Sequence, residues 1–213
     1  MSEIKEKSIE QYLDELASKQ ATPGGGSAAA MMGAQAVALV SMVCHLTIGK
    51  PKYAEVDAQM RDLLAEADAL RCLLLGMIQA DVEVFNRLMA CYALPKTTEQ
   101  EKIERSEKIQ AVLKEAIQVP LDCAKACAET IRLSRVAAQK GSLGVISDAG
   151  VAVMSGYAAL KSAALNVEIN ASSSKDRLFA ESKLRELELV LHSADKDAEA
   201  VYQLVRSRLD QIS

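Results

Sequence analysis

The chain has 213 residues and a formal net charge of −4; half of its residues are hydrophobic, but only 3% are aromatic. A core of Ala, Leu, Val, Ile and Met, with few aromatic residues, favours close-packed helices over a sheet sandwich. The negative charge and the lack of a dense Lys/Arg stripe argue against a nucleic-acid partner. The length suits one well-buried domain, so we expect a single all-α domain over residues 1–213.

The cysteines point to a reducing compartment. There are five, an odd number, with no Cys-x-x-Cys pair, as is typical of reduced thiols in a cytoplasmic protein. Cys123 and Cys127 are one helical turn apart, but no second pair of ligands accompanies them, so no metal site is expected. The N-terminal stretch has no apolar signal core. We therefore expect a cytoplasmic protein.

The first two predicted helices differ in character. Ile9, Leu13 and Leu16 recur at helical spacing and predict an amphipathic helix over about residues 8–19. Residues 28–46 form a second, almost wholly apolar helix. Its length is that of a membrane span, but Ala, Gly and Ser dominate it and no aromatic belt flanks it. We predict a central helix buried on all sides and no membrane contact.

The rest of the chain repeats this helical pattern. Thr97 or Thr98 is placed to cap a helix after the break at residues 94–96, and Pro120 is expected to kink that helix. A second Gly/Ser-rich break, at residues 140–144, leads into another helix of small residues. The further helices are predicted over about residues 54–93, 97–139, 145–170 and 175–212. The result is an up-and-down bundle with two Ala/Gly-rich central helices.

The run Thr-Pro-Gly-Gly-Gly-Ser at residues 22–27 opens the first apolar helix. Proteins keep glycine where a side chain would block a backbone turn or a ligand. The free N–H groups and the dipole of a helix N-terminus favour a carbonyl, carboxylate or phosphate oxygen. The alternative is a flexible turn capped by Ser27. No Lys precedes Ser27, so this is not a Walker-type phosphate loop.

Polar residues are scarce in the two small-residue helices, so those present are candidates for a site. Ser147 and Asp148 would either cap their helix or place a carboxylate beside a ligand. Asn166 and Asn170, four residues apart on one helical face, would either order a core network or bind the donors and acceptors of a heterocycle.

Other candidates lie outside these two helices. Asp81, with Phe85 nearby, follows an apolar run and falls either within the bundle or on its solvent side. Three lysines would attract an acidic substrate tail or simply be solvated: Lys50, Lys52 and Lys96. No Ser/His/Asp or Cys/His arrangement can be assembled around the two histidines.

Six ordered motifs resemble the formiminotransferase-cyclodeaminase C-terminal family. They are TPGGGSAA (22–29), VCHLTIGK (43–50), DVEVF (81–85), LPK (94–96), ISDAGVA (146–152) and ALNVEIN (164–170). The resemblance covers nearly the whole chain. Within the family, the chain looks most like the free-standing bacterial methenyltetrahydrofolate cyclohydrolases of one-carbon metabolism.

The resemblance implies an all-helical homodimer that binds a reduced folate, expected to be polyglutamylated, near the glycine turn. Hydrolysis of the cyclic amidinium needs a carboxylate and ligand-orienting donors but no metal or redox cofactor. Asp148 is the first choice for the general base, Asp81 for a second acid/base or pterin anchor, with Ser147 beside them. The residues implied in substrate binding are Pro23, Gly24, Gly25, Gly26, Ser27, Lys50, Lys52, Phe85, Lys96, Asn166 and Asn170.

Two other functions stay open at this point. A formimidoyltetrahydrofolate cyclodeaminase would close the same ring by expelling ammonia, through a tetrahedral carbon of the same kind. A non-catalytic helical assembly protein would use the glycine turn only to pack helices.

Overall fold

The computed structural model describes residues 4–210, and within that range the protein is all-helical with no strand. This confirms the predicted all-α class. Short 3₁₀ segments occur at Ile4–Glu6, Pro51–Val56 and Leu143–Val145. The α-helices are α1 (Ile9–Leu16), α2 (Gly25–His45), α3 (Asp57–Tyr92), α4 (Glu99–Lys140), α5 (Ile146–Ser172) and α6 (Arg177–Leu209).

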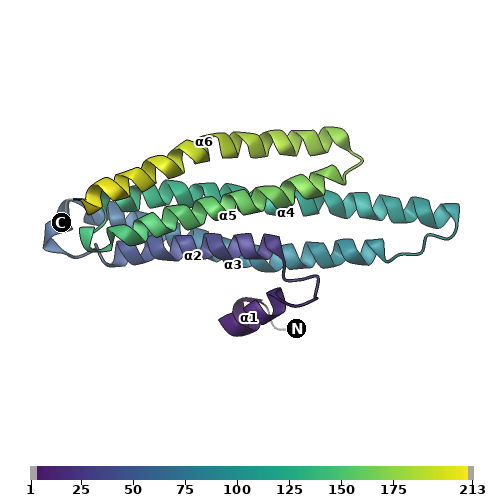
Figure 1. Cartoon of the computed structure of the whole chain (residues 1–213), viewed down its shortest axis with the longest axis horizontal. Helices are drawn as coiled ribbons and strands as arrows, with labels where there is room; N and C mark the ends of the chain where they lie inside the picture. Colours follow the sequence, from purple (N-terminus) through teal and green to yellow (C-terminus); the bar gives the residue numbers. More distant parts are fainter. Residues whose placement is uncertain (1–3, 211–213) are drawn as a thin grey trace.

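The two Ala-rich helices, α2 and α5, lie side by side in the bundle (Figure 1). They pack against each other; α3 and α4 also pack on α2, and α4 and α6 pack on α5. The short α1 lies to one side of α2. This arrangement confirms the predicted helical bundle.

The unequal lengths of the helices shape the molecule. With 36 and 42 residues, α3 and α4 outrun α2, which has 21, and α5, which has 27. The two long helices therefore continue as a paired arm (Figure 1). The arm has a small core of its own: Val84, Leu88, Ile109, Leu113 and Ala116. Where α2 begins and α5 ends, the arm leaves the main bundle.

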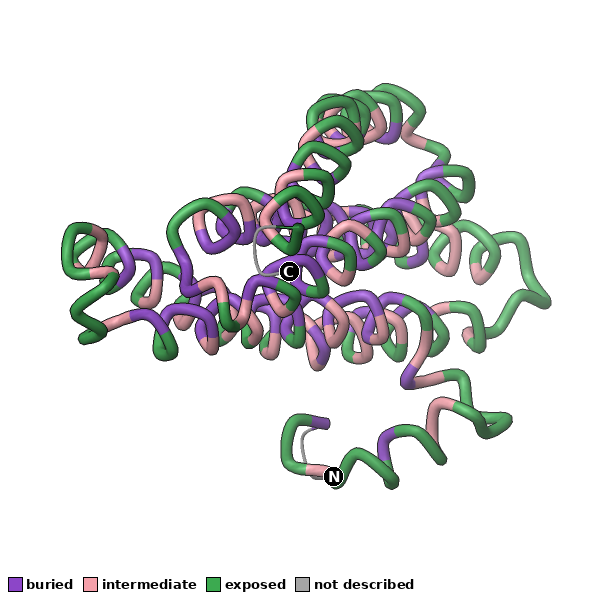
Figure 2. Tube along the Cα trace, turned by 60° about the vertical axis from the view of Figure 1, so that its left-hand side comes forward, coloured by how far each residue is buried: buried purple, intermediate pink, exposed green. Residues whose placement is uncertain are grey.

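Burial of the central helices is incomplete within one chain. Buried residues gather between the helices and exposed ones cover the outer faces (Figure 2). Yet α2 exposes Gln35 and Ala38, and α5 exposes Val151 and Leu165. The expected burial of α2 on all sides thus holds only in part, because no helix within residues 4–210 fully covers the face that carries Gln35 and Ala38. Both α2 and the α5 region are long and apolar enough to span a membrane by length and composition.

Most helix ends differ from the predicted ones by a few residues. Ser8 caps α1, which ends at Leu16 rather than near residue 19. Glycine-rich residues expected to precede α2 instead form its first turn, since α2 begins at Gly25. Of the two possible caps for α4, Thr98 is the one used, in a reciprocal pair with Glu101. The expected end of the last helix, near residue 212, lies outside the described residues.

Pro120 lies inside α4, which continues through it. Proline has no N–H, so the carbonyl of Ala116, four residues earlier, loses its helical partner. Asn170 of α5 supplies the missing donor, with 2.6 Å between its Nδ2 and the Ala116 oxygen. Asn170, one of the two candidate asparagines, therefore provides the hydrogen bond that the Ala116 carbonyl loses to Pro120, at the site of the expected kink.

Candidate functional site

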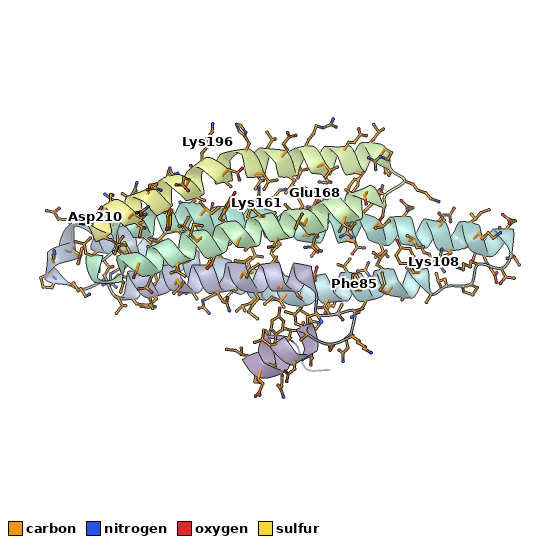
Figure 3. The ribbon with its side chains drawn as sticks, in the orientation of Figure 1. Phe85, Lys108, Lys161, Glu168, Lys196 and Asp210 are labelled. Carbon is orange, nitrogen blue, oxygen red and sulfur yellow. The ribbon has the colours of Figure 1, made fainter. Side chains whose placement is uncertain are left out.

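A pocket of about 270 Å³ lies where α2 begins, α5 ends and the α3–α4 arm departs. Phe85 marks its place on α3, close to the first turn of α2 (Figure 3). The pocket brings together six of the predicted binding residues and one predicted acid/base. Its lining residues are Ala21, Thr22, Gly24, Gly25, Gly26, Asp81, Val84, Phe85, Leu88, Ala116, Asn166, Ile169 and Asn170.

The Asp81 carboxylate sits directly against the first turn of α2. A Cβ added to Gly26 would lie 2.0 Å from Asp81 Oδ1, so only glycine fits there. The backbone N–H of Ser27, in the same turn, lies close enough to the Asp81 carboxylate to act to lower its pKa. The helix N-terminus therefore binds an anion, as its glycines predict, but that anion is a side chain of this chain.

The environment of Asp81 opposes its ionisation. Burial raises the pKa of its carboxyl group, and the nearby Ser27 N–H only partly offsets this. Asp81 is therefore a stronger base than an exposed carboxylate. The sequence allowed Asp81 to lie either within the bundle or on its solvent side, and the structure places it within the bundle.

The two asparagines present acceptors to the pocket. Asn166 Nδ2 donates to the Ser162 carbonyl (2.9 Å), and Asn170 Nδ2 donates to Ala116. Each bond uses one of the two N–H groups of an amide nitrogen, so the side-chain oxygens and the second N–H groups remain for a ligand. Asn166 lies beside Gly25, where an added Cβ would be 3.7 Å from its amide atoms, an ordinary contact. Gly25 also has no left-handed φ, so its backbone does not require glycine.

Ser27 does not occupy the N-cap position. Its hydroxyl reaches back to Gly24, accepting from the backbone N–H (3.0 Å) and donating to the carbonyl (2.8 Å). Next to it, the Tyr12 hydroxyl is buried and has no hydrogen-bond partner of sound geometry among residues 4–210, although Ser27 and Asp81 are near enough to affect its pKa. Burial is the main cause that raises the Tyr12 pKa.

Four predicted site residues lie at the opposite end of the bundle. Asn166 and Asp148 are separated by 18 residues of α5, which is about 27 Å along a helix. Asp148 is half-buried in the first turn of α5, where its charge suits the helix dipole. Ser147 beside it is exposed. Lys50 and Lys52 are exposed at the same end, and Lys50 Nζ lies 3.4 Å from Ser142 Oγ.

Three further predicted residues lie outside the pocket, one of them Ser27, which is buried and bonded back to Gly24. Lys96 is exposed in the turn between α3 and α4, at the tip of the arm. Pro23 is buried behind the glycine turn and does not line the pocket. Conversely, the analysis of the sequence missed Val84, Leu88 and Ile169 as pocket residues, since their spacing is that of ordinary core positions. It also missed the pairing of Gly26 with Asp81, although Asp81 continues the buried stripe of Leu74 and Ile78 at helical spacing.

A larger cleft of about 420 Å³ lies between α1 and α2. Its walls are mostly apolar, and the carboxylate and amide groups that suit a polar ligand lie in the smaller pocket. Among the described residues, no group of three or more His, Cys, Asp or Glu side chains is arranged to hold a metal ion. We therefore take the glycine-turn pocket as the candidate site.

Comparison with known proteins supports the all-helical fold. A family model for formiminotransferase-cyclodeaminase matches residues 8–189. The chain is 53% identical to a methenyltetrahydrofolate cyclohydrolase of Methylorubrum extorquens, over 96% of this chain and 98% of that protein. It is 30% identical to the formimidoyltransferase-cyclodeaminase of Rattus norvegicus, over 94% of this chain but only 37% of that protein. A solved structure of formiminotetrahydrofolate cyclodeaminase from Thermotoga maritima superimposes with a TM-score of 0.82 at 28% identity, covering 99% of both chains.

Proposed function

This chain belongs to the formiminotransferase-cyclodeaminase family, and we propose that it hydrolyses 5,10-methenyltetrahydrofolate to 10-formyltetrahydrofolate. The observation that carries the proposal is the buried Asp81 carboxylate in a pocket that also offers the side-chain oxygens of Asn166 and Asn170 as acceptors. Such a pocket suits a planar cation with N–H donors, which describes the substrate. The 53% identity to a methenyltetrahydrofolate cyclohydrolase adds support.

The proposed reaction consumes only substrate and water. In the substrate, one carbon bridges N5 and N10 as an amidinium cation. Water adds to this carbon, and one water proton leaves as the carbon–oxygen bond forms. The tetrahedral adduct then collapses: its hydroxyl loses the second water proton as the C=O bond forms, N5 takes up a proton as its bond to carbon breaks, and the formyl group stays on N10. The sum is one water consumed and one proton released.

Asp81 suits the role of base in this reaction. Its raised pKa makes it a better proton acceptor than an exposed carboxylate, and a bound cation would favour its ionised form. Phe85 offers a face for the pterin ring, while Asn166 and Asn170 offer oxygens to its N–H groups. Asp148, at the other end of α5, would have to act from outside this pocket.

We further propose that the protein is a cytoplasmic homodimer and that its substrate carries a polyglutamate tail. The exposed cations Lys50, Lys52 and Lys96 support an acidic tail. A net charge of −4 without a basic stripe is the argument against nucleic acid. The apolar residues left uncovered on α5 support self-association.

The test is the decay of methenyltetrahydrofolate absorbance with purified protein, compared with the spontaneous rate in the same buffer. We expect acceleration proportional to enzyme concentration, unchanged after dialysis against a chelator, since no metal takes part in the proposed steps. The second candidate is the cyclodeaminase, favoured by the structural likeness to the Thermotoga maritima enzyme. Ammonia release from the formimino substrate without accelerated hydrolysis would transfer the assignment to it.

A further inference from the structure

The exposed face of α5 carries an apolar stripe. Its members are Val151 (53% exposed), Met154 (42%), Ala158, Leu165 (66%) and Ile169 (64%). The stripe runs between α6, whose Asp195 binds Tyr157 and Lys161, and α2, whose Gly25 faces Asn166. The most apolar 18-residue stretch of the Leu143–Ser172 segment has a mean hydropathy of 1.5, and only 44% of it is buried inside the chain, so an apolar partner surface is expected to cover it.

The spacing of this stripe is symmetric about Ala158. Val151 and Leu165 lie seven residues on either side of it, and Met154 and Ser162 lie four residues on either side. Two α5 helices packed antiparallel across a two-fold axis at Ala158 would therefore match side chain to side chain, with the smallest residue at the crossing.

Charges beside the stripe fit the same pairing. Glu168 of α5 is exposed on the side of the stripe that carries Lys161 (Figure 3). Arg206 of α6 lines a groove with Ser147 and Val151. It therefore lies on the same α6 side of the stripe as Glu168, but at the Val151 end. Neither side chain has an ion-pair partner within residues 4–210. The two-fold axis would bring each Glu168 to the partner's Arg206.

We propose that two copies of this chain pair through antiparallel α5 helices, and that each glycine-turn pocket is completed by the partner's Asp148. Asp148 and Asn166 are 18 residues, or five full turns, apart and so share one face of α5, the side toward α2. The two-fold axis leaves the α2 side of one α5 next to the α2 side of the other. It therefore places the partner's Asp148 level with residue 168, beside Asn166 and Asn170, across an interhelical distance of about 8–10 Å.

This arrangement unites the residues that one chain holds apart. The pocket within one chain has a single carboxylate and no basic residue in its lining. The same rotation carries the exposed Lys50 and Lys52 of the partner toward the glycine-turn end, where the acidic tail of a folate would leave the pocket. The part of the inference that concerns catalysis rests on the proposed function; the part that concerns the interface does not.

The interface is tested by sedimentation. Leu165→Arg should convert a dimer to a monomer that keeps its helical spectrum, whereas Leu189→Arg, equally exposed at 76% but on α6, should leave the dimer intact. Glu168→Arg and Arg206→Glu should each weaken the dimer, and the double swap should restore it. The interface would be overturned by a monomeric wild-type protein, by a dimer that survives Leu165→Arg, or by a double swap that does not restore the dimer. A monomer that binds lipid vesicles would show that the stripe faces a membrane instead.

The shared site is tested by mixing two variants. Asp81→Asn and Asp148→Asn should each be nearly inactive, but unfolded and refolded together they should recover about a quarter of wild-type activity, because half of the dimers carry one intact site. High-affinity binding of 10-formyltetrahydrofolate should recover in the same proportion. A stable dimer without recovery would place Asp148 outside the site. A wild-type protein that binds folate but does not hydrolyse it would contradict only the proposed function. Recovery of folate binding in the mixed variants would then test whether the two chains share a site.

Discussion

The two ends of the α2–α5 pair carry similar polar residues but differ in what those residues do. At the glycine-turn end, Asp81 is buried against a helix N-terminus and faces a pocket. At the other end, polar groups satisfy the backbone: Thr47 Oγ1 accepts from the Ser142 N–H (2.8 Å), and Tyr53 Oη accepts from the Leu143 N–H (2.9 Å). Within one chain, only the first end combines a pocket with a carboxylate whose ionisation is disfavoured.

Asp81→Asn should have the largest effect on activity. Asn keeps an acceptor for the Ser27 N–H but removes the base, so we expect turnover to fall by about 10³-fold. Stability should not fall. Because burial raises the Asp81 pKa above its ordinary value of 3.8, the ionised side chain costs stability once the pH rises through the raised pKa.

The variant should therefore gain melting temperature over the wild type more at pH 7 than at pH 4. Melting curves at both values, beside the absorbance assay, check this. A variant with normal turnover would remove Asp81 from the chemistry, and one less stable at pH 7 would contradict the direction of the pKa shift.

Gly26→Ala should come next. The new Cβ would overlap Asp81 Oδ1, so the carboxylate must move. We expect a loss of about 10²-fold in turnover and about 1–3 kcal/mol in the free energy of unfolding. Gly25→Ala is the matched control, since its Cβ makes only an ordinary contact with Asn166. Equal effects of the two substitutions, in kinetics and denaturant unfolding, would contradict the special role of Gly26.

Asn170→Ala should lower the free energy of unfolding by about 1–3 kcal/mol, because it leaves the Ala116 carbonyl unpaired. Pro120→Ala supplies a helical N–H to that carbonyl. The Asn170→Ala cost should therefore shrink in a Pro120→Ala background, as a double-mutant cycle by denaturant unfolding would measure. Equal costs in both backgrounds would show that Asn170 does not compensate for the proline.

Tyr53→Phe should have the smallest effect. It should distinguish most clearly the backbone-supporting bonds at the Tyr53 end from the pocket at the glycine-turn end. It removes the acceptor of the Leu143 N–H, for which we expect a loss of about 0.5–1.5 kcal/mol in stability. Turnover and KM should stay unchanged, since this bond only holds the segment before α5. A change in turnover at unchanged stability would mean that the Tyr53–Leu143 bond itself, beyond holding the segment before α5, contributes to catalysis.

Much of the site was foreseeable residue by residue. The glycine turn, Asp81, Phe85 and both asparagines were singled out as scarce polar or glycine positions in apolar helices, and one pocket contains them. The separation of Asp148 from that group within one chain was not foreseeable. A motif shows which residues occur together in a chain, but helix length decides whether they meet. The 18 residues between Asp148 and Asn166 span α5.

The sequence by itself determined the helical class, the order of the helices and the two central small-residue helices, because periodicity and composition act locally. Tertiary structure decided what each polar group does. Gly26 makes room for Asp81 because α3 passes the first turn of α2, and Asn170 binds Ala116 because Pro120 leaves a carbonyl free on α4. Such pairings join residues distant in sequence, and they depend on where helices of unequal length end against one another.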